Sequence, residues 1–172
     1  ISHVHLDHIS GLVIASPAST PKPIYGTSAT IEHLKNHIFN WEVWPNFADD
    51  GEGTNLNVLE YNTLLPGQNQ NIEGTRFRVQ AFLLSHQEPS HSTAFLIEYL
   101  GDYALYIGDT GADELEGSQN LENLWHEVAP LIRENKLSGM FLECSYSDEK
   151  PDAKLFGHLN PKWMLRELNH LA

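Results

Sequence analysis

Four potential metal ligands stand within six residues near the start of the chain, in the run His3-Val4-His5-Leu6-Asp7-His8. Imidazole and carboxylate groups suit zinc, iron and manganese. Residues i and i+2 of an extended segment point to the same side, so His3 and His5 can approach one ion together. Asp7 and His8 follow where the chain turns into a helix, and their changed direction lets them serve a second ion. The run therefore predicts a binuclear metal site.

The same run resembles the metal motif of the metallo-β-lactamase superfamily. The stretch from His3 to the closing Ser16-Pro17 is similar to the signature of class II cyclic-AMP phosphodiesterases. The resemblance implies one hydrolase domain over residues 1–172, an α/β fold built as a four-layer α/β/β/α sandwich that lacks its N-terminal strands. It also implies hydrolysis of the 3',5'-cyclic phosphodiester of cAMP to AMP by a hydroxide that bridges two metal ions.

Three later residues match further ligands of the superfamily in the right order. They are a histidine at a strand end (His86), an aspartate after a hairpin strand (Asp109) and a histidine before a late helix (His158). An ordinary Gly-Asp-Thr-Gly turn and two loop histidines are the alternative interpretations. The resemblance implies that one ion is held by His3, His5 and His86, the other by Asp7, His8 and His158, and that Asp109 bridges them.

The implied cofactor is a pair of divalent ions, with zinc favoured and iron or manganese as alternatives. Two dications contribute about +4 and the carboxylates of Asp7 and Asp109 about −2, so the site stays positive and would attract an anionic phosphodiester. Catalysis is assigned to Asp7, Asp109 and His91. His91 could contact phosphate or protonate a leaving group, with simple exposure on a loop as the alternative.

Other candidate residues have weaker support. His33 and His37 are four apart on an expected helix but lack carboxylate partners, so they are left out of the site. Glu143 and Cys144 at a strand end are interpreted as groups behind the ligands or as buried residues. An irregular stretch contains the aromatic residues Trp41, Trp44 and Phe47. Their side chains could stack on a purine or form a satellite core.

Alternating strands and helices would have to position these residues. Period-2 patterns and Gly or Pro breakers predict strands, whereas apolar spacing of three to four residues predicts helices. Gly101-Asp102 is expected as a hairpin turn, Ser28 as a helix N-cap and Pro161 as the first residue of the last helix. The expected strands are 23–25, 55–65, 76–84, 93–100, 103–107 and 139–142, and the expected helices are 9–15, 29–39, 121–135 and one from 161.

Composition limits the partners. Ten Lys and Arg against 23 Asp and Glu give a net charge of −13, which argues against nucleic acid and leaves a small cyclic nucleotide as the expected substrate. No apolar run approaches the roughly 18 residues that would cross a membrane, so no membrane partner is expected. A homodimer is possible, and the compartment, periplasm or cytoplasm, stays open. Because the chain starts at Ile1, a piece of a longer protein is expected.

Three rival functions share part of this evidence. A tRNA 3'-processing endonuclease has a similar metal motif, but the chain offers no basic surface for RNA. A di-iron oxygen-reducing protein of the same fold usually has glutamate where His5 stands. A non-catalytic, metal-stabilised module that binds nucleotide is the rival of another class.

Overall fold

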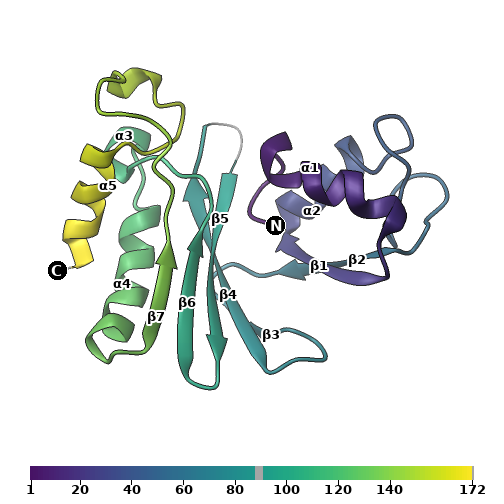
Figure 1. The fold of residues 1–172 in the computed structure, drawn as a ribbon, viewed down its shortest axis with the longest axis horizontal. Coiled ribbons are helices and arrows are strands. Elements are labelled where there is room, and N and C mark those ends of the chain that lie inside the picture. The colour runs from purple at the N-terminus through teal and green to yellow at the C-terminus, as the bar shows by residue number, and fades with distance from the viewer. Residues whose placement is uncertain (88–90, 172) are drawn as a thin grey trace. The chain divides into compact units, whose positions relative to one another are not determined.

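The computed structural model describes residues 1–87 and 91–171 and divides into two compact units, residues 1–65 and 66–172. Figure 1 labels the helices and strands of both units. Each unit has its own sheet, a parallel pair in the first and five strands in the second. In the part of the chain that is described, no helix combines the length and apolarity that a membrane crossing requires. The expectation of one domain over residues 1–172 stays a prediction.

The first unit packs two helices on a pair of parallel strands. Its elements are α1 (Leu6–Ala15), β1 (Lys22–Thr27), α2 (Ser28–His37) and β2 (Leu59–Leu64), with a short 3-10 helix at Ser16–Ala18. Strands β1 and β2 pair in parallel, with Ile24 opposite Tyr61. Ile9 of α1 and Leu34 of α2 share a fully buried core with Leu59 of β2. This core fixes α1, and with it the residues that lead into α1.

The two helices of the first unit begin differently. Helix α1 begins directly after His5, whose backbone is extended (φ −61°, ψ 144°) and whose carbonyl accepts from the His8 and Ile9 amides. Helix α2 begins after Thr27, whose hydroxyl accepts from the Thr30 amide. The expected N-cap at Ser28 is therefore wrong by one residue. Strand β1 continues through Gly26 to Thr27, and the capping residue of α2 is therefore Thr27, one residue before Ser28.

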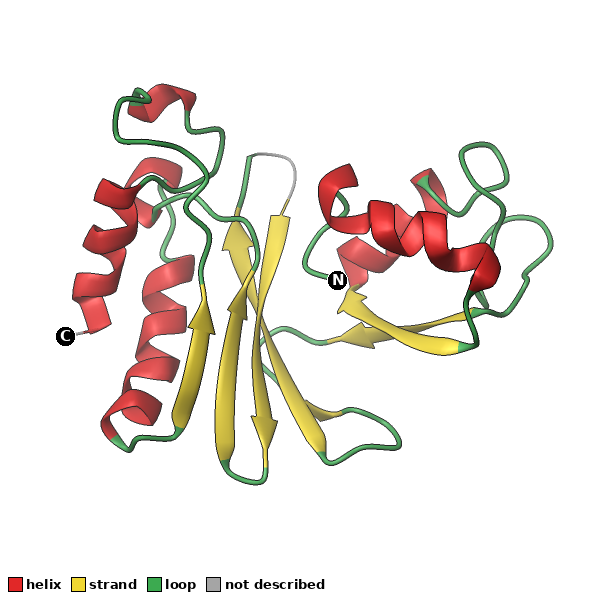
Figure 2. Ribbon diagram, viewed as in Figure 1, coloured by secondary structure: helices red, strands yellow, loops and turns green. Residues whose placement is uncertain are grey.

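The second unit is a five-stranded sheet with helices packed on one face (Figure 2). The strand order is β3-β4-β5-β6-β7, antiparallel except for the parallel β6–β7 pair, and the crossover between those two contains α4. Helix α4 buries Leu124 and Trp125 against sheet residues such as Leu84 and Leu105. The elements are β3 (Asn69–Asn71), β4 (Phe77–Ser85), β5 (His91–Tyr99), β6 (Asp102–Ile107), α3 (Asp113–Glu116), α4 (Asn120–Arg133), β7 (Leu137–Phe141), a 3-10 helix (Asp152–Lys154), α5 (Pro161–Leu168) and a last 3-10 helix (Asn169–Leu171).

The β5–β6 hairpin has its turn one residue earlier than expected. Tyr99 pairs with Asp102, so the two turn residues are Leu100 and Gly101 rather than Gly101 and Asp102. Both have positive φ, 54° and 95°, as the favoured two-residue hairpin turn requires. Leu100 is exposed. The pairing of β5 with β6 sets the register that places it in the turn.

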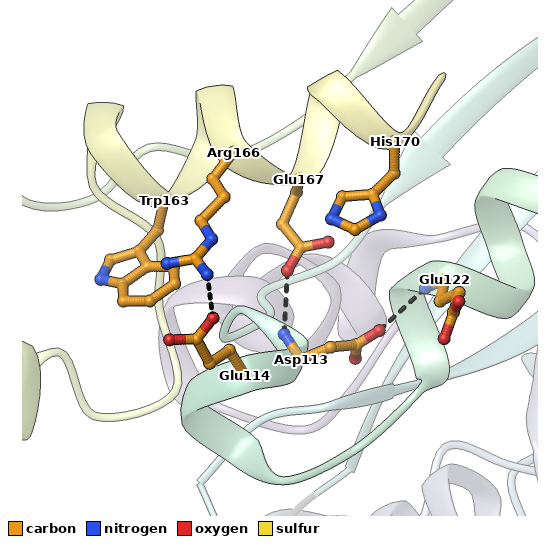
Figure 3. Close-up of a pocket in the computed structure, with 7 residues that line it drawn as sticks. All are labelled: Asp113, Glu114, Glu122, Trp163, Arg166, Glu167 and His170. Carbon is orange, nitrogen blue, oxygen red and sulfur yellow. Dashed lines mark hydrogen bonds and ion pairs between the residues drawn. The ribbon is translucent and has the colours of Figure 1, made fainter. Parts of the chain in front are cut away.

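Helix α5 is fastened to the rest of the second unit by a buried carboxylate. Pro161 is its first residue, as expected, and Asn160 caps it by accepting from the Trp163 amide. Glu167 is 5% exposed and accepts from the Asp113 amide at 3.0 Å and from the Trp125 indole at 3.3 Å. Figure 3 shows Glu167 pointing toward Asp113, with the Arg166–Glu114 ion pair beside it. The carboxylate thus joins α5 to both α3 and α4.

Candidate metal centre

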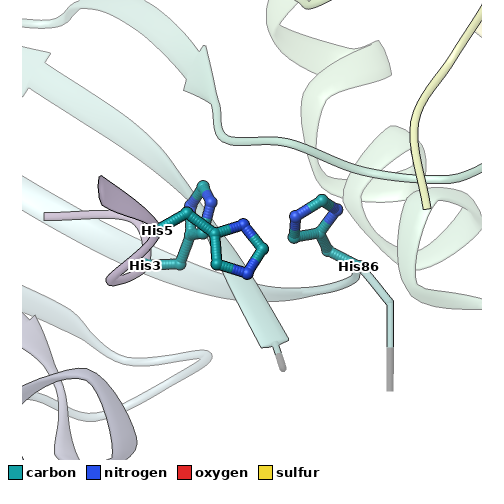
Figure 4. A group of neighbouring side chains, drawn as sticks. All are labelled: His3, His5 and His86. Atoms are coloured by element: carbon teal, nitrogen blue, oxygen red, sulfur yellow. The ribbon is translucent and has the colours of Figure 1, made fainter. Parts of the chain in front are cut away.

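The histidine run of the first unit gathers its imidazoles at the start of α1. The ring centroids of His3 and His5 lie 4.6 Å apart, and those of His3 and His8 lie 4.3 Å apart. His3 and His5 appear in Figure 4. Asp7 and His8 occupy the first turn of α1, which begins at Leu6 and not at the expected residue 9, and a carboxylate oxygen of Asp7 lies 3.5 Å from His8 Nε2. The run therefore concentrates donor atoms through local chain geometry alone.

The second unit brings together the three later candidate ligands from separate loops. His86 follows β4, Asp109 follows β6, and His158 precedes α5. One ligand atom from each lies within 4.8 Å of the other two, which is a spacing that can hold a metal ion. His86 and Asp109 are buried, and His158 is partly buried. Two imidazoles and a carboxylate are a donor set that zinc accepts.

Both imidazoles of this cluster are oriented through Nδ1. His86 Nδ1 lies 2.7 Å from the carbonyl oxygen of Gly157, and His158 Nδ1 lies 2.9 Å from Glu143 Oε1. Histidine ligands of metals usually donate their second ring N–H to a carbonyl or a carboxylate in this way. Nε2 is then the ring nitrogen through which each imidazole could bind an ion. The orientation of the rings, together with the donor set, fits a divalent metal.

Gly157 is the point at which the loop before α5 comes closest to the end of β4. Its φ is 74°, and a Cβ placed there would lie 2.4 Å from the Gln87 amide nitrogen and 3.1 Å from backbone atoms of His86. Glycine is therefore required both by the left-handed backbone and by the close approach. This approach is what allows the Gly157 carbonyl to accept from His86.

Ser85 ties the His86 loop to the Asp109 loop. The Ser85 carbonyl accepts from the Gly111 amide at 2.9 Å and from the Thr110 hydroxyl at 3.3 Å. Its own hydroxyl accepts from the Asn120 side-chain amide at 2.8 Å, at the start of α4. Together with the His86–Gly157 contact, these bonds link the three ligand-bearing loops of the second unit to one another.

Glu143 is an ionised, hydrogen-bonded carboxylate beside His158. Burial raises its pKa, but hydrogen bonds from His158 and Ser145 outweigh burial and bring the pKa below its usual value. From its place at a strand end, Glu143 is expected as a group behind the ligands or as a buried residue. It lies two residues after β7. The exposed Cys144 next to it has a pKa raised by partial burial and by the charge of Glu143, so it is held as a thiol.

The other candidate residues lie at varied positions. His91 is an exposed residue at the start of β5, paired with Ser85 across the β4–β5 ladder. The residues just before it, 88–90, lie outside the described part of the chain. The rings of His33 and His37 are neighbours along α2, with centroids 5.7 Å apart and planes tilted by 40°.

The aromatic stretch of the first unit divides between core and surface. Trp44 and Phe47 pack against the buried cluster of that unit, and the Trp44 indole donates to Ser16 Oγ at 3.0 Å. Trp41 is 46% exposed, and its indole donates to the Thr54 carbonyl. The satellite-core interpretation therefore describes Trp44 and Phe47, whereas Trp41 presents half of its surface to solvent.

Comparison with known proteins places these features in a family. All 172 residues match the family model of class-II cAMP phosphodiesterases. A probable 3',5'-cyclic-nucleotide phosphodiesterase of Yersinia pestis is 43% identical over 171 residues, which cover 99% of this chain and 50% of that protein. The chain thus spans about half the length of the curated relatives it matches.

Solved structures agree with this assignment. Unliganded yeast PDE1 superposes with a TM-score of 0.86 at 32% identity, over 99% of this chain and 50% of that one. The metallo-β-lactamase fold protein YhfI of Bacillus subtilis gives 0.64 at 18% identity, over 99% and 58%, which is a likeness of fold alone. The expected α/β metallo-β-lactamase-like fold is confirmed, and the chain belongs to the class-II cAMP phosphodiesterase family.

Proposed function

We propose that this chain carries the metal centre of an enzyme that hydrolyses the 3',5'-cyclic phosphodiester of cAMP to AMP. Family membership supports the reaction class. The observation that carries the proposal is the convergence of His86, Asp109 and His158, with both imidazoles held through Nδ1 by protein acceptors. Such oriented donors are typical of a metal site rather than of three unrelated loop residues.

The proposed cofactor is a pair of divalent ions, with zinc favoured. When bound, two such ions would supply positive charge for an anionic phosphodiester and lower the pKa of a water molecule that attacks phosphorus. The proposed ligands are those that the family resemblance implies: His3, His5, Asp7, His8, His86, Asp109 and His158. The chain has a net charge of −13, which by itself would repel a small anion. The positive charge of the metal ions would therefore be what attracts the phosphodiester.

The residues of the chain have separate proposed roles in the reaction. Asp7 and Asp109 contribute negative charge that offsets only part of the charge of the ions. The loop that carries Asp109 is held by hydrogen bonds from the Thr110 hydroxyl and the Gly111 amide to the Ser85 carbonyl. Hydrolysis adds water across the bond between phosphorus and O3', so O3' must gain a proton as that bond breaks. We assign His91 as the donor of this proton, a role that general acids fill with rate gains of about 10²–10⁴.

The test uses full-length protein loaded with zinc. We expect hydrolysis of cAMP to AMP and two zinc ions per chain. Asp109→Ala and His158→Ala should each lower kcat/KM by about 1000-fold, because a metal centre supplies several kcal/mol of transition-state stabilisation. Asp102→Ala is the matched control. Asp102 is an exposed aspartate at the start of β6, the strand that Asp109 follows, so its substitution should leave kcat/KM unchanged.

Each outcome bears on a different part of the proposal. Undiminished turnover in Asp109→Ala and His158→Ala would refute the ligand assignment. Absence of turnover with any cyclic nucleotide would refute the substrate. Calorimetry that shows cAMP bound without product would favour the rival, a metal-stabilised binding module. Full turnover in His91→Ala would remove only the proposed acid.

A further inference from the structure

Glu143 accepts four hydrogen bonds, one of them from the candidate ligand His158 and one from the amide that follows the candidate ligand Asp109. Its Oε1 accepts from His158 Nδ1 at 2.9 Å and from the Thr110 amide at 3.2 Å. Its Oε2 accepts from the Ser145 amide at 3.0 Å and from the Ser145 hydroxyl at 2.5 Å. The side chain is 11% exposed. A carboxylate offers about four acceptor positions, so this group is fully used.

The contact with His158 selects one form of its imidazole. A carboxylate accepts but cannot donate, so the hydrogen between Glu143 and His158 belongs to Nδ1. A neutral imidazole with its hydrogen on Nδ1 has a lone pair on Nε2, which is the form that binds a metal. Asp109 Oδ2 lies 3.8 Å from the same Nδ1, too far for a hydrogen bond, so Glu143 is the acceptor that fixes the ring.

The contact with Thr110 acts on the other ligand. Thr110 follows Asp109 directly, and its amide belongs to the peptide group that joins the two residues. A hydrogen bond to that amide restrains the rotation of the backbone at Asp109. The same oxygen, Oε1, accepts from both partners, so the positions of Asp109 and His158 are set from one atom.

We propose that Glu143 is a positioning residue that sets the geometry of His158 and Asp109 together for metal binding. The inference rests on the proposed function, because it concerns the affinity of the same metal centre. His86 is oriented by a backbone carbonyl that no substitution removes. The orientation of His158 depends on a side chain and can therefore be tested.

The test compares Glu143→Ala with Glu167→Ala in full-length protein. Glu167 is also a buried glutamate that accepts from a backbone amide and from a side-chain N–H, but its partners Asp113 and Trp125 are not candidate ligands. Glu143→Ala removes the oxygen that accepts from both His158 and Thr110. We expect zinc affinity, measured by competition with a chelator, to fall 10- to 100-fold. In Glu167→Ala zinc affinity should stay within about twofold while the midpoint of urea unfolding falls.

A spectroscopic readout separates positioning from general stability. In the zinc-loaded wild type, ¹⁵N NMR of the imidazoles should show the hydrogen of His158 on Nδ1. In Glu143→Ala this hydrogen should lose its carboxylate acceptor, and its resonance should broaden through exchange with water.

Three results would overturn the inference, and they are distinguishable. Unchanged zinc affinity in a folded Glu143→Ala protein would show that Glu143 does not position the ligands. A His158 hydrogen on Nε2 in the zinc-loaded wild type would contradict the orientation itself. Absence of zinc binding by the wild type would remove the proposed function and the inference together.

Discussion

The two units of this chain supply candidate metal ligands in opposite ways. In the first unit four ligands follow one another along the sequence, and a single change of backbone direction at His5 separates them into an extended part and a helical part. In the second unit His86, Asp109 and His158 come from three loops that only the tertiary fold brings together. The first arrangement depends on where one helix begins, and the second depends on hydrogen bonds between loops.

This difference indicates where each region is vulnerable. The histidine run has its geometry from α1, so it should be disturbed by anything that loosens the packing of that helix. The geometry of the cluster in the second unit depends on hydrogen bonds of Gly157, Ser85 and Glu143. Small changes at these loop contacts should therefore disturb it. Four variants, two of them with a control, test this contrast.

Ile9→Ala has the largest expected effect. Ile9 follows His8, is 0% exposed and packs into the core of the first unit. Its truncation should lower the free energy of unfolding by about 3 kcal/mol, as large-to-small core substitutions do. Ile14→Ala is the control on the same helix, because Ile14 is 73% exposed and should cost about 0.5 kcal/mol or less. Equal losses in urea denaturation followed by circular dichroism would show that Ile9 does not anchor α1.

Gly157→Ala should affect the second unit more specifically. The strain of positive φ and the 2.4 Å approach to the Gln87 amide should together cost about 2 kcal/mol of stability and weaken zinc binding. Gly67→Ala is the control, since Gly67 has a similar φ of 76° but no atom within 4 Å of the position that a Cβ would take. It should cost about 1 kcal/mol through φ alone. If chelator competition gave the two variants the same zinc affinity, the Gly157 contact would not hold the cluster.

Trp44→Phe has a smaller expected effect, confined to the first unit. It removes the indole that donates to Ser16 Oγ at 3.0 Å and should cost about 1 kcal/mol in urea unfolding. The KM for cAMP should not change, because the side chain packs against the core. A raised KM with unchanged stability would revive the alternative interpretation, in which these aromatic rings stack on a purine.

The double substitution of His33 and His37 by alanine should have the smallest effect. The two rings are neighbours along α2 and belong to none of the groups that could hold a metal among the described residues. Zinc content per chain, measured by atomic absorption, should match that of the wild type. Loss of one zinc ion would show that imidazoles four residues apart on a helix were wrongly left out of the ligand set.

Local patterns predicted most elements but misplaced their ends. The strand before His86, the β5–β6 hairpin, α4 and the start of α5 at Pro161 all agree with the sequence patterns. The hairpin turn and the cap of α2 were each wrong by one residue, because strand pairing and strand length are set by neighbouring chain segments. The short strand β3 was not predicted, since Asn69–Asn71 has no apolar alternation and pairs only because β4 offers an edge.

The candidate site was predictable to different depths. The ligands of the run are visible as residue types at close spacing, and those of the second unit were named through the family resemblance. The need for glycine at position 157 and the double contact of Glu143 had no sequence signal, because each depends on a backbone or side chain distant in the sequence.

The sequence by itself determined the donor set of the run, a change of backbone direction within it and the family, because these depend on residues that are neighbours along the chain. Only the tertiary structure decided that a carbonyl 71 residues away would orient His86, and that one carboxylate would contact both His158 and the peptide after Asp109. Such contacts form when paired strands bring their loops to one end of a sheet. The spacing of residues along the chain does not show which loops will lie close together in space.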